Sequence, residues 1–441
     1  MRILQSVTFA FAAFLLAACQ GMITQPASNA LPAFKHSGGR GTSYSYSIIA
    51  EFYSGQLTGG TPYGGLIADS AGNLYGTTSQ GGAYQMGTVF ELSASGSSYV
   101  GTTLYSFGGP GDGTDPVDSL YMDSHGALYG TTQYGGPFAT SSNSGYGIVF
   151  KLTPGASGYT ETILHAFQPL PDGHEPRSGV VADANGALYG TTRIGGNSDD
   201  GTVFKLTPSG SGYAESIIVN FNSNNGWFPN YGNLLLGKHG VLYGTTSGDA
   251  TPGNIFELKR SGNRYKEHVL YNFDGAPDGY GPNGTLLSDK KGNLYATTYY
   301  GGSCASYGGG CGVVYELKRA GSQYSEIVLY RFKGTSMSGP QDGAFPLAGL
   351  VMDSKGELYG TTNQGGNFKT CDGVGCGTVF KLARSGSGGY TETVLHEFEG
   401  SSDGYYPAAP LLANGGVFYG LTSSGGNPSN YGGVAFAITP L

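Results

Sequence analysis

Short hydrophobic segments recur along the chain in a fixed order, and each is bounded by Gly, Asp, Ser or Pro. Most copies begin with an apolar run that ends in Asp, such as residues 66–69, followed by the string Leu-Tyr-Gly-Thr-Thr. A segment similar to Gly-Thr-Val-Phe comes next, and the last segment runs from a Tyr to a Phe eight positions later. β-branched and aromatic residues dominate all four segments, so we predict four strands, named A to D in chain order. The Asp-x-x-Gly step between A and B predicts a tight hairpin turn.

The Leu-Tyr-Gly-Thr-Thr string and its variants give the number of copies. Its Tyr lies at positions 75, 129, 189, 243, 295, 359 and 419, which makes seven copies of about 57 residues each. Four antiparallel strands in each of seven copies predict an all-β fold, a seven-bladed β-propeller.

The two ends of the repeat region predict how the ring closes. The last copy stops at Leu441 just after its C segment, whereas residues 44–52 form a D segment that has no A, B or C segment before it. We expect this N-terminal strand to pair with the last blade, because that pairing completes the blade and protects the edge of its sheet. The propeller would then span residues 44–441.

These motifs also carry a resemblance to a known family. The run Gly-Asn-Leu-Tyr-Gly-Thr-Thr-Ser-Gln-Gly-Gly from Gly72, with Gly-Thr-Val-Phe-Glu-Leu from Gly87, resembles the GloVer tandem repeat of bacterial exported proteins. The resemblance covers residues 44–441. It implies an exported, surface-anchored repeat protein, and it implies no activity and no catalytic residue.

The N-terminus is typical of a lipoprotein signal. Arg2 precedes a mostly apolar stretch that is too short to span a membrane comfortably, and small residues lead directly to Cys19. This end resembles a bacterial lipobox, which implies removal of residues 1–18 and acylation of Cys19. Residues 19–43 would be a flexible tether, and Gln20 after the Cys suggests the outer membrane. The alternative is an ordinary signal peptide with a chance Cys.

Composition and charge exclude several classes of protein. Charged residues make up 12% of the chain and its net charge is −8, so neither intrinsic disorder nor a general affinity for nucleic acid or an anionic membrane surface is indicated. The partners we expect are the membrane, through the lipid anchor, and a carbohydrate or protein ligand. We expect no nucleic acid partner.

The other four cysteines form two close pairs. An even number of cysteines in an exported chain predicts disulfides, here Cys304 with Cys311 and Cys371 with Cys376. A Cys₄ zinc site is the alternative, if the two loops meet.

One face of the predicted ring is the better candidate for binding. The D–A and B–C connections should share a face, and the B–C connections vary in length and hold both cysteine pairs. The A–B and C–D connections look uniform. The D–A connections repeat the pattern Asp-Gly-x-x-Pro, which could form a ring of calcium ligands or, as we favour, a simple turn.

The residues around these prolines are the candidate ligand-binding residues. Aromatic side chains occupy four adjacent blades and could stack on sugars or contact a partner, or could instead pack under the B–C loops: Trp227, Phe228, Tyr280, Phe345, Tyr405 and Tyr406. A polar cluster could lie beside them: Asp118, His174, Glu175 and Arg177, with Asp115, Asn230, Asn233 and Asn283.

Catalytic motifs are missing from the sequence. It has no nucleophile elbow, P-loop or zinc motif, and His174 is the only histidine expected on the variable face. We therefore predict a binding scaffold with no cofactor and no catalytic residue. The alternative is an enzyme that acts on polysaccharide, such as a lyase, at the same face.

Overall fold

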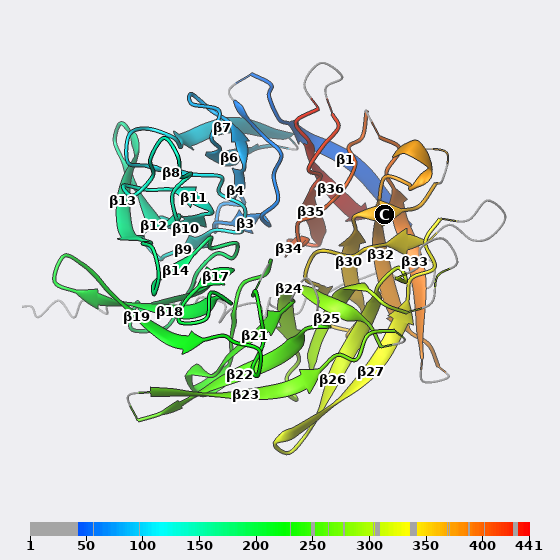
Figure 1. Ribbon diagram of the computed structural model, residues 1–441. Coiled ribbons are helices and arrows are strands. Elements are labelled where there is room, and N and C mark those ends of the chain that lie inside the picture. The colour runs from blue at the N-terminus through cyan, green and yellow to red at the C-terminus, as the bar shows by residue number, and fades with distance from the viewer. Residues whose placement is uncertain are drawn as a thin grey trace, which may run out of the picture.

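The chain forms a ring of seven four-stranded antiparallel sheets, which confirms the predicted propeller (Figure 1). The computed structural model describes residues 43–441 except 56, 97, 230, 248–251, 263, 277, 303, 305–308, 336–341, 368, 370, 387–388, 401 and 427–430. Cys19, with the predicted signal peptide and most of the predicted tether, lies outside the described residues.

The inner A strands are short except in blade 5, and the B, C and D strands lie progressively further from the axis of the ring. From blade 1 to blade 7 they are β3 (Ile67–Ala68), β4 (Leu74–Thr78), β6 (Thr88–Ser95), β7 (Ser98–Ser106); β9 (Tyr121–Met122), β10 (Leu128–Thr132), β12 (Ile148–Gly155), β13 (Gly158–Ala166); β15 (Val181–Ala182), β16 (Leu188–Thr192), β18 (Thr202–Ser209), β19 (Gly212–Asn220); β20 (Leu235–Leu236), β21 (Leu242–Thr246), β22 (Asn254–Ser261), β23 (Arg264–Asn272); β24 (Tyr280–Ser288), β25 (Leu294–Tyr300), β26 (Val313–Ala320), β27 (Gln323–Arg331); β29 (Val351–Met352), β30 (Leu358–Thr362), β32 (Thr378–Arg384), β33 (Tyr390–Glu397); and β34 (Leu412–Asn414), β35 (Val417–Leu421), β36 (Val434–Pro440), β1 (Tyr44–Glu51).

The N-terminal strand closes the ring as predicted. β1 pairs antiparallel with β36 from Tyr44 opposite Pro440 to Glu51 opposite Val434, so blade 7 combines both ends of the chain (Figure 1). The backbone N–H of Leu441 also donates to the carbonyl of Ser43 (2.8 Å).

The core is repeated at each junction between blades. The Phe that follows a D strand meets the central aromatic ring of the next C strand edge-on, as in Phe107 and Phe150, whose ring centroids lie 5.0 Å apart. The Gly of the B strand makes room for this ring, because a Cβ on Gly130 would lie 2.6 Å from the Phe150 ring. The repeated Gly therefore serves packing.

The A–B turns are built alike in most blades. In blade 3, Asp183 accepts hydrogen bonds from the backbone of Asn185 and Ala187 and from the Tyr189 hydroxyl, at 2.9 to 3.0 Å. Asp69, Asp123, Asp289 and Asp353 accept the same set of bonds in their own blades. The Tyr of the B strand is thus a structural residue that holds the turn of its own blade.

The D–A and B–C connections share one face, as predicted, and they pair more than the sequence indicated. Two-residue ribbons join them in four blades: β2 (Gly59–Gly60) with β5 (Gln80–Gly81), β8 (Gly113–Thr114) with β11 (Tyr134–Gly135), β14 (Gly173–His174) with β17 (Ile194–Gly195), and β28 (Gly343–Ala344) with β31 (Gln364–Gly365). In blade 5, β24 and β25 extend and take the place of a ribbon.

The described residues contain little helix. Only two 3₁₀ turns occur among them, η1 (Lys238–Gly240) and η2 (Cys371–Gly373). Within residues 43–441 as described, no helix has the length and apolar character needed to cross a membrane.

The predicted disulfides are present. Cys304 bonds to Cys311 and Cys371 bonds to Cys376, with Cα–Cα distances of 5.7 and 5.3 Å. The two bonds lie in separate B–C connections, on blades 5 and 6, so the Cys₄ zinc alternative is wrong.

Candidate functional site

The residue before the repeated proline has the same unusual backbone in every blade. Its φ lies between 49° and 67°, the left-handed region, although only one of the seven residues is Gly: Thr61, Asp115, Glu175, Phe228, Gly281, Phe345 and Tyr406. In blade 3, the Glu175 N–H donates to the carbonyl of Tyr146 in the preceding blade, and the Arg193 N–H donates to the Glu175 carbonyl (both 3.1 Å). These bonds offset a conformational cost of about 1–2 kcal/mol per residue. They hold a ring of side chains around the mouth of the central channel.

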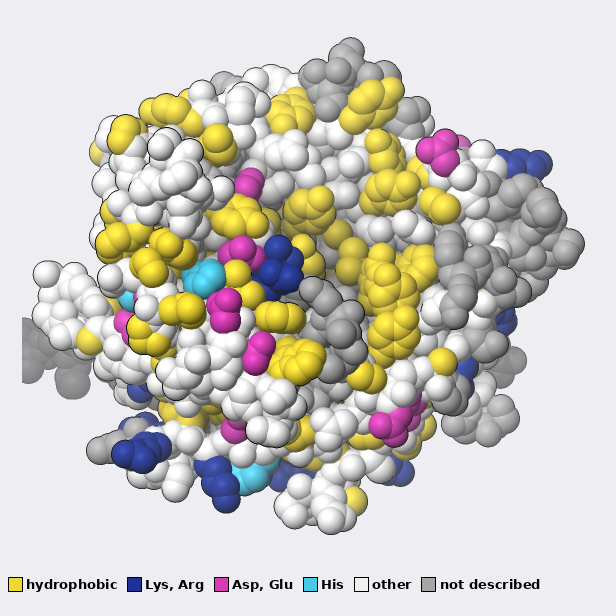
Figure 2. Space-filling view, viewed as in Figure 1, with side chains coloured by type: hydrophobic (Ala, Val, Ile, Leu, Met, Phe, Trp, Pro, Cys, Tyr) yellow, Lys and Arg dark blue, Asp and Glu magenta, His cyan; other side chains and the backbone are white. Residues whose placement is uncertain are grey.

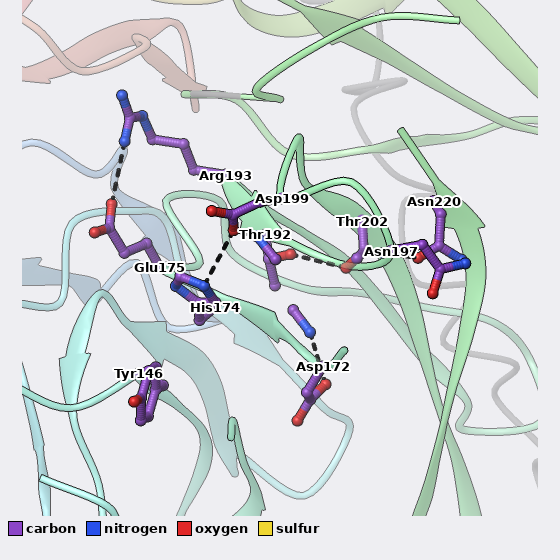
Figure 3. A network of polar contacts seen from close by, with 12 residues as sticks. Tyr146, Asp172, His174, Glu175, Thr192, Arg193, Asn197, Asp199, Thr202 and Asn220 are labelled. Atoms are coloured by element: carbon purple, nitrogen blue, oxygen red, sulfur yellow. Dashed lines mark hydrogen bonds and ion pairs between the residues drawn. The ribbon is translucent and has the colours of Figure 1, made fainter. Parts of the chain in front are cut away.

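Blade 3 supplies the polar side of this mouth (Figure 3). The Glu175 carboxylate lies 3.4 Å from the Arg193 guanidinium and 3.6 Å from that of Arg177. Each guanidinium also lies over an aromatic ring of blade 4: Arg193 over Phe228 and Arg177 over Tyr231, 5.2 and 5.7 Å from the ring centroids. Both arginines are therefore fixed in position and still partly exposed.

A second polar pair lies beside the first. His174 Nε2 is 3.5 Å from an Asp199 carboxylate oxygen, and the Tyr146 ring meets the imidazole edge-on at 5.5 Å (Figure 3). Asp199 is itself anchored, because it accepts a hydrogen bond from the Gly195 N–H (2.9 Å). The two pairs offer carboxylate acceptors and cationic or imidazole donors within one small area.

Aromatic side chains form the other side of the mouth. On blade 5, Tyr280 and Tyr300 stack with centroids 4.9 Å apart, and Tyr299 packs on Phe345 of blade 6 at 5.0 Å. Exposed aromatic rings on this face include Tyr63, Tyr231 and Tyr300. Figure 2 shows histidine, acidic and basic side chains gathered near the centre of the ring, with hydrophobic side chains across from them.

Of the predicted aromatic residues, one is buried in the core and the others are partly exposed. Phe345 is only 6% exposed and belongs to the core between blades 5 and 6, which agrees with the packing alternative for this residue. Phe228 lies under Arg193, and Tyr405 and Tyr406 meet edge-on at 4.9 Å. Trp227 is half-buried. The predicted aromatic side chains thus form a layer in which some rings pack beneath others or beneath an arginine.

Several residues of the mouth were not singled out from the sequence: Tyr63, Tyr146, Arg193, Asp199, Tyr231, Tyr299 and Tyr300. Arg193 and Tyr299 directly follow the Thr-Thr of the repeated string, and other copies have Ser79, Gln133 and Asn363 there. The residue at this position varies from copy to copy while the string before it is uniform, and that contrast could have identified the position from the sequence.

Below the mouth, the residues just before the A strands of neighbouring blades approach one another and form a neck. A Cβ on Gly64 would lie 2.3 Å from the backbone of Asp118, so neighbouring blades touch there. Asp118 Oδ1 accepts from the Ser119 N–H (2.5 Å), and Asp118 Oδ2 is buried without a hydrogen bond of normal length. Burial raises the pKa of Asp118 to about 6, although the N–H groups of Ser119, Gly179 and Gly232 oppose this shift.

The other predicted polar residues sit around the same neck. Asn233 Oδ1 would lie 3.0 Å from a Cβ on Gly179, and Asn283 is 7% exposed. Asn230 lies outside the described residues. A cavity of about 400 Å³ opens beyond the neck between the A strands, and most of its lining is apolar, as with Leu120 and Val181. The mouth and this cavity are therefore separate spaces.

The Asp of the Asp-Gly-x-x-Pro pattern stabilises a turn. Asp342 accepts from the backbone N–H groups of Lys333 and Gly343 and from the Tyr330 hydroxyl at 2.7 to 3.0 Å. Asp112, Asp172, Asp278 and Asp403 likewise meet a Tyr or His of the preceding D strand. Among the described residues, no group of three or more His, Cys, Asp or Glu is placed to hold a metal ion. The turn interpretation accounts for these contacts.

A Glu from the next D strand faces this Asp at several junctions. Burial raises the pKa of Glu392 to about 8, and the nearby Asp342 carboxylate adds to the shift. The pKa of Glu161 beside Asp112 and that of Glu326 beside Asp278 rise to about 7, for the same reasons. At the junction of blades 3 and 4 an amide replaces the Asp, and Asn225 Nδ2 donates to Glu267 (2.7 Å).

Comparison with solved structures shows the fold alone. A fungal alcohol oxidase of the AA5 family in complex with copper is 14% identical with a TM-score of 0.55, and the match covers 90% of this chain and 76% of that one. A periplasmic gluconolactonase of Pseudomonas aeruginosa is 15% identical (TM-score 0.48; 76% and 85% covered), and a PL25 ulvan lyase is 11% identical (TM-score 0.46; 86% and 89% covered). No curated protein sequence matches the chain.

Comparison with protein families gives a specific result. A model of the Gloeobacter/Verrucomicrobia repeat matches residues 33–247, 138–340 and 211–436, so the overlapping matches span nearly all seven blades. The chain belongs to the Gloeobacter/Verrucomicrobia repeat family.

Proposed function

We propose that this protein is an exported binding protein of the bacterial envelope and that it holds carbohydrate at the mouth of the ring. The observation that carries the proposal is a set of exposed tyrosines on three blades, around the same mouth as the charge pairs of blade 3. Tyr63, Tyr231 and Tyr300 are 39%, 36% and 37% exposed. Their ring faces can pack against the apolar faces of sugars. Glu175 can accept hydrogen bonds from sugar hydroxyls, and Arg193 can donate hydrogen bonds to them.

The charge of the mouth favours a neutral sugar. Two arginines, Arg177 and Arg193, share the mouth with three carboxyl groups, those of Asp115, Glu175 and Asp199. An acidic sugar would meet net repulsion there. A neutral oligosaccharide can instead use the carboxylates as hydrogen-bond acceptors without that cost.

An enzyme that acts on polysaccharide at the same mouth is the second candidate. The observation that favours it is His174, whose imidazole Asp199 can orient as a base beside the Tyr146 ring. The same binding experiment separates the two functions, because an enzyme would release shorter products from the bound sugar.

An array of neutral oligosaccharides, probed with residues 20–441, tests the proposal. A stacked ring contributes about 1–2 kcal/mol, so Tyr63→Ala and Tyr231→Ala should each weaken binding roughly tenfold or more and leave the melting temperature nearly unchanged. Ile327→Ala and Val269→Ala are the matched controls, because these side chains are 39% and 36% exposed on outer strands. Equal binding by all four variants, or binding of proteins and no glycan, would refute a carbohydrate site at the mouth.

The proposed location in the cell envelope depends on Cys19 and is tested separately. We propose that Cys19 carries the lipid, so Cys19→Ser should abolish labelling by radioactive fatty acid and move the protein out of the detergent phase. Unchanged labelling would show that the lipid is elsewhere.

A further inference from the structure

The A–B/C–D face carries a dense group of positive charges on one half of the ring. Ten exposed lysines and arginines lie on or directly beside the A–B and C–D turns of blades 4 to 6. The same turns of blades 1 to 3 hold no lysine or arginine. We call these ten residues the basic arc: Lys238, Arg260, Arg264, Lys266, Lys290, Lys291, Lys318, Arg319, Lys355 and Arg384.

Nearby carboxylates leave most of this charge uncompensated at the surface. Asp289 and Asp353 are held inside their own turns by backbone N–H groups and a Tyr hydroxyl. Glu357 pairs with Lys381 at 2.7 Å, a lysine outside the arc, and it also interacts with Lys355 of the arc. Within the described parts of the chain, every exposed Asp or Glu side chain lies on the opposite, D–A/B–C face: Asp199, Asp274, Asp372 and Glu399. The net charge of −8 thus conceals a separation of charge between the two faces.

The N-terminal segment leaves the ring on the same face as the basic arc. β36 runs from the B–C connection of blade 7 toward its C–D end, and β1 pairs with it in the opposite direction, starting at Tyr44 opposite Pro440. Residue 43 therefore lies at the A–B/C–D face. The 42 residues before it, which include the predicted lipid attachment site, must connect to the ring from this side.

We propose that the basic arc docks on the anionic phosphate groups of a lipid membrane surface, so that the mouth of the ring faces away from the membrane. Clustered lysines and arginines bind anionic headgroups mainly by charge. The turns of three adjacent blades end at one side of the ring, so several can touch a flat surface together. The position of residue 43 favours a membrane over a nucleic acid as the anionic surface. This inference is independent of the proposed sugar ligand.

Co-sedimentation with vesicles tests the proposal with unlipidated residues 20–441, which include the closing strand and all seven blades. The probes are vesicles of phosphatidylcholine alone and vesicles with 30% phosphatidylglycerol. The triple variant Lys290→Gln, Lys291→Gln, Lys318→Gln removes three charges from the arc. The matched control, Arg331→Gln, Lys333→Gln, Lys369→Gln, removes three exposed charges from the D–A/B–C side and changes the net charge equally.

The expected result has three parts. The wild-type chain binds the anionic vesicles and not the neutral ones, the arc variant binds at least about tenfold more weakly, and the control binds like wild type. Raising the salt concentration from 0.1 to 0.5 M should release the wild-type protein. Equal binding by the two variants would overturn the proposal. So would binding to duplex DNA at the same phosphate concentration without binding to the vesicles.

Discussion

The two faces of the ring are made by the same repeat and yet differ in almost every side chain they expose. On the A–B/C–D face, one Asp per turn holds the hairpin and a Tyr in the same way in five blades. On the D–A/B–C face, the backbone bonds also recur, but the side chains they hold range from Glu175 through Phe228 to Gly281. A repeated Asp holds most of the turns on both faces. On the D–A/B–C face, however, the residue before each proline keeps its backbone conformation while its side chain varies. A repeat can therefore vary a side chain at a position whose conformation is held by main-chain hydrogen bonds.

The distribution of exposed hydrophobic side chains supports this contrast. Among the described residues, none of the large exposed ones lies on an A–B or C–D turn, apart from the C-terminal Leu441. Those of the D–A/B–C face are Tyr63, Tyr84, Met86, Phe138, Leu170, Tyr231, Tyr300 and Tyr431, and the others lie on outer strands. Such side chains belong on a surface that contacts something.

Removing the closing strand should have the largest effect, because both faces depend on a closed ring. Deletion of residues 43–52 exposes the edge of β36 and should abolish cooperative thermal unfolding or cause aggregation. Deletion of residues 20–41 should change the melting curve little. Equal melting of the two deletion proteins would show that closure by β1 is unimportant.

Substitution of a turn Asp should lower stability without affecting the mouth. Asp183→Ala leaves the Tyr189 hydroxyl and two backbone N–H groups without their acceptor, which should cost about 2–3 kcal/mol in the free energy of unfolding. Chemical denaturation measures this loss. Sugar binding by the folded variant should equal that of wild type, and selective loss of binding would show that the A–B/C–D face takes part.

Stability should fall as the pH rises from about 5 to about 8. The pKa of Glu392 is raised from 4.5 to about 8 in the folded protein. The contribution of this carboxyl group to the free energy of unfolding is therefore complete below pH 4.5 and is lost as the pH approaches 8. Glu392→Gln should reduce this pH dependence by about 1–2 kcal/mol after allowance for solvent screening. Glu267→Gln is the internal control, because Asn225 already replaces the Asp at that junction. A flat pH profile of the wild-type protein would contradict this account.

The left-handed backbone of the mouth should favour Gly and disfavour β-branched residues. Glu175→Gly removes the carboxylate without backbone strain and should leave stability within about 0.5 kcal/mol of wild type, whereas Glu175→Val should cost about 1–2 kcal/mol more. Thermal unfolding of the pair measures the difference. Equal stability would mean that the loop relaxes out of this conformation.

The sequence predicted the architecture well because the repeat itself is the structural unit. Seven copies of the Leu-Tyr-Gly-Thr-Thr string or a variant of it predicted the seven blades, and the unpaired segment 44–52 predicted β1. The same reasoning did less well at the mouth, where side chains from two or three blades meet. Nothing in the local sequence shows that Arg193 lies over Phe228, or that Phe345 is covered by Tyr299, because these contacts join different repeats. The basic arc could have been found by counting charges turn by turn, which the net charge of the whole chain concealed.

The fluorescence of Trp227 tests the difference between the two faces most directly. It is the only Trp in the chain, and it lies in a D–A connection on the face of the mouth. We expect a bound oligosaccharide to shift or quench the emission of Trp227. We expect anionic vesicles made with brominated lipid to bind the protein without quenching that emission. Quenching by the brominated vesicles, together with no response to any bound oligosaccharide, would place the membrane at the mouth and contradict the account.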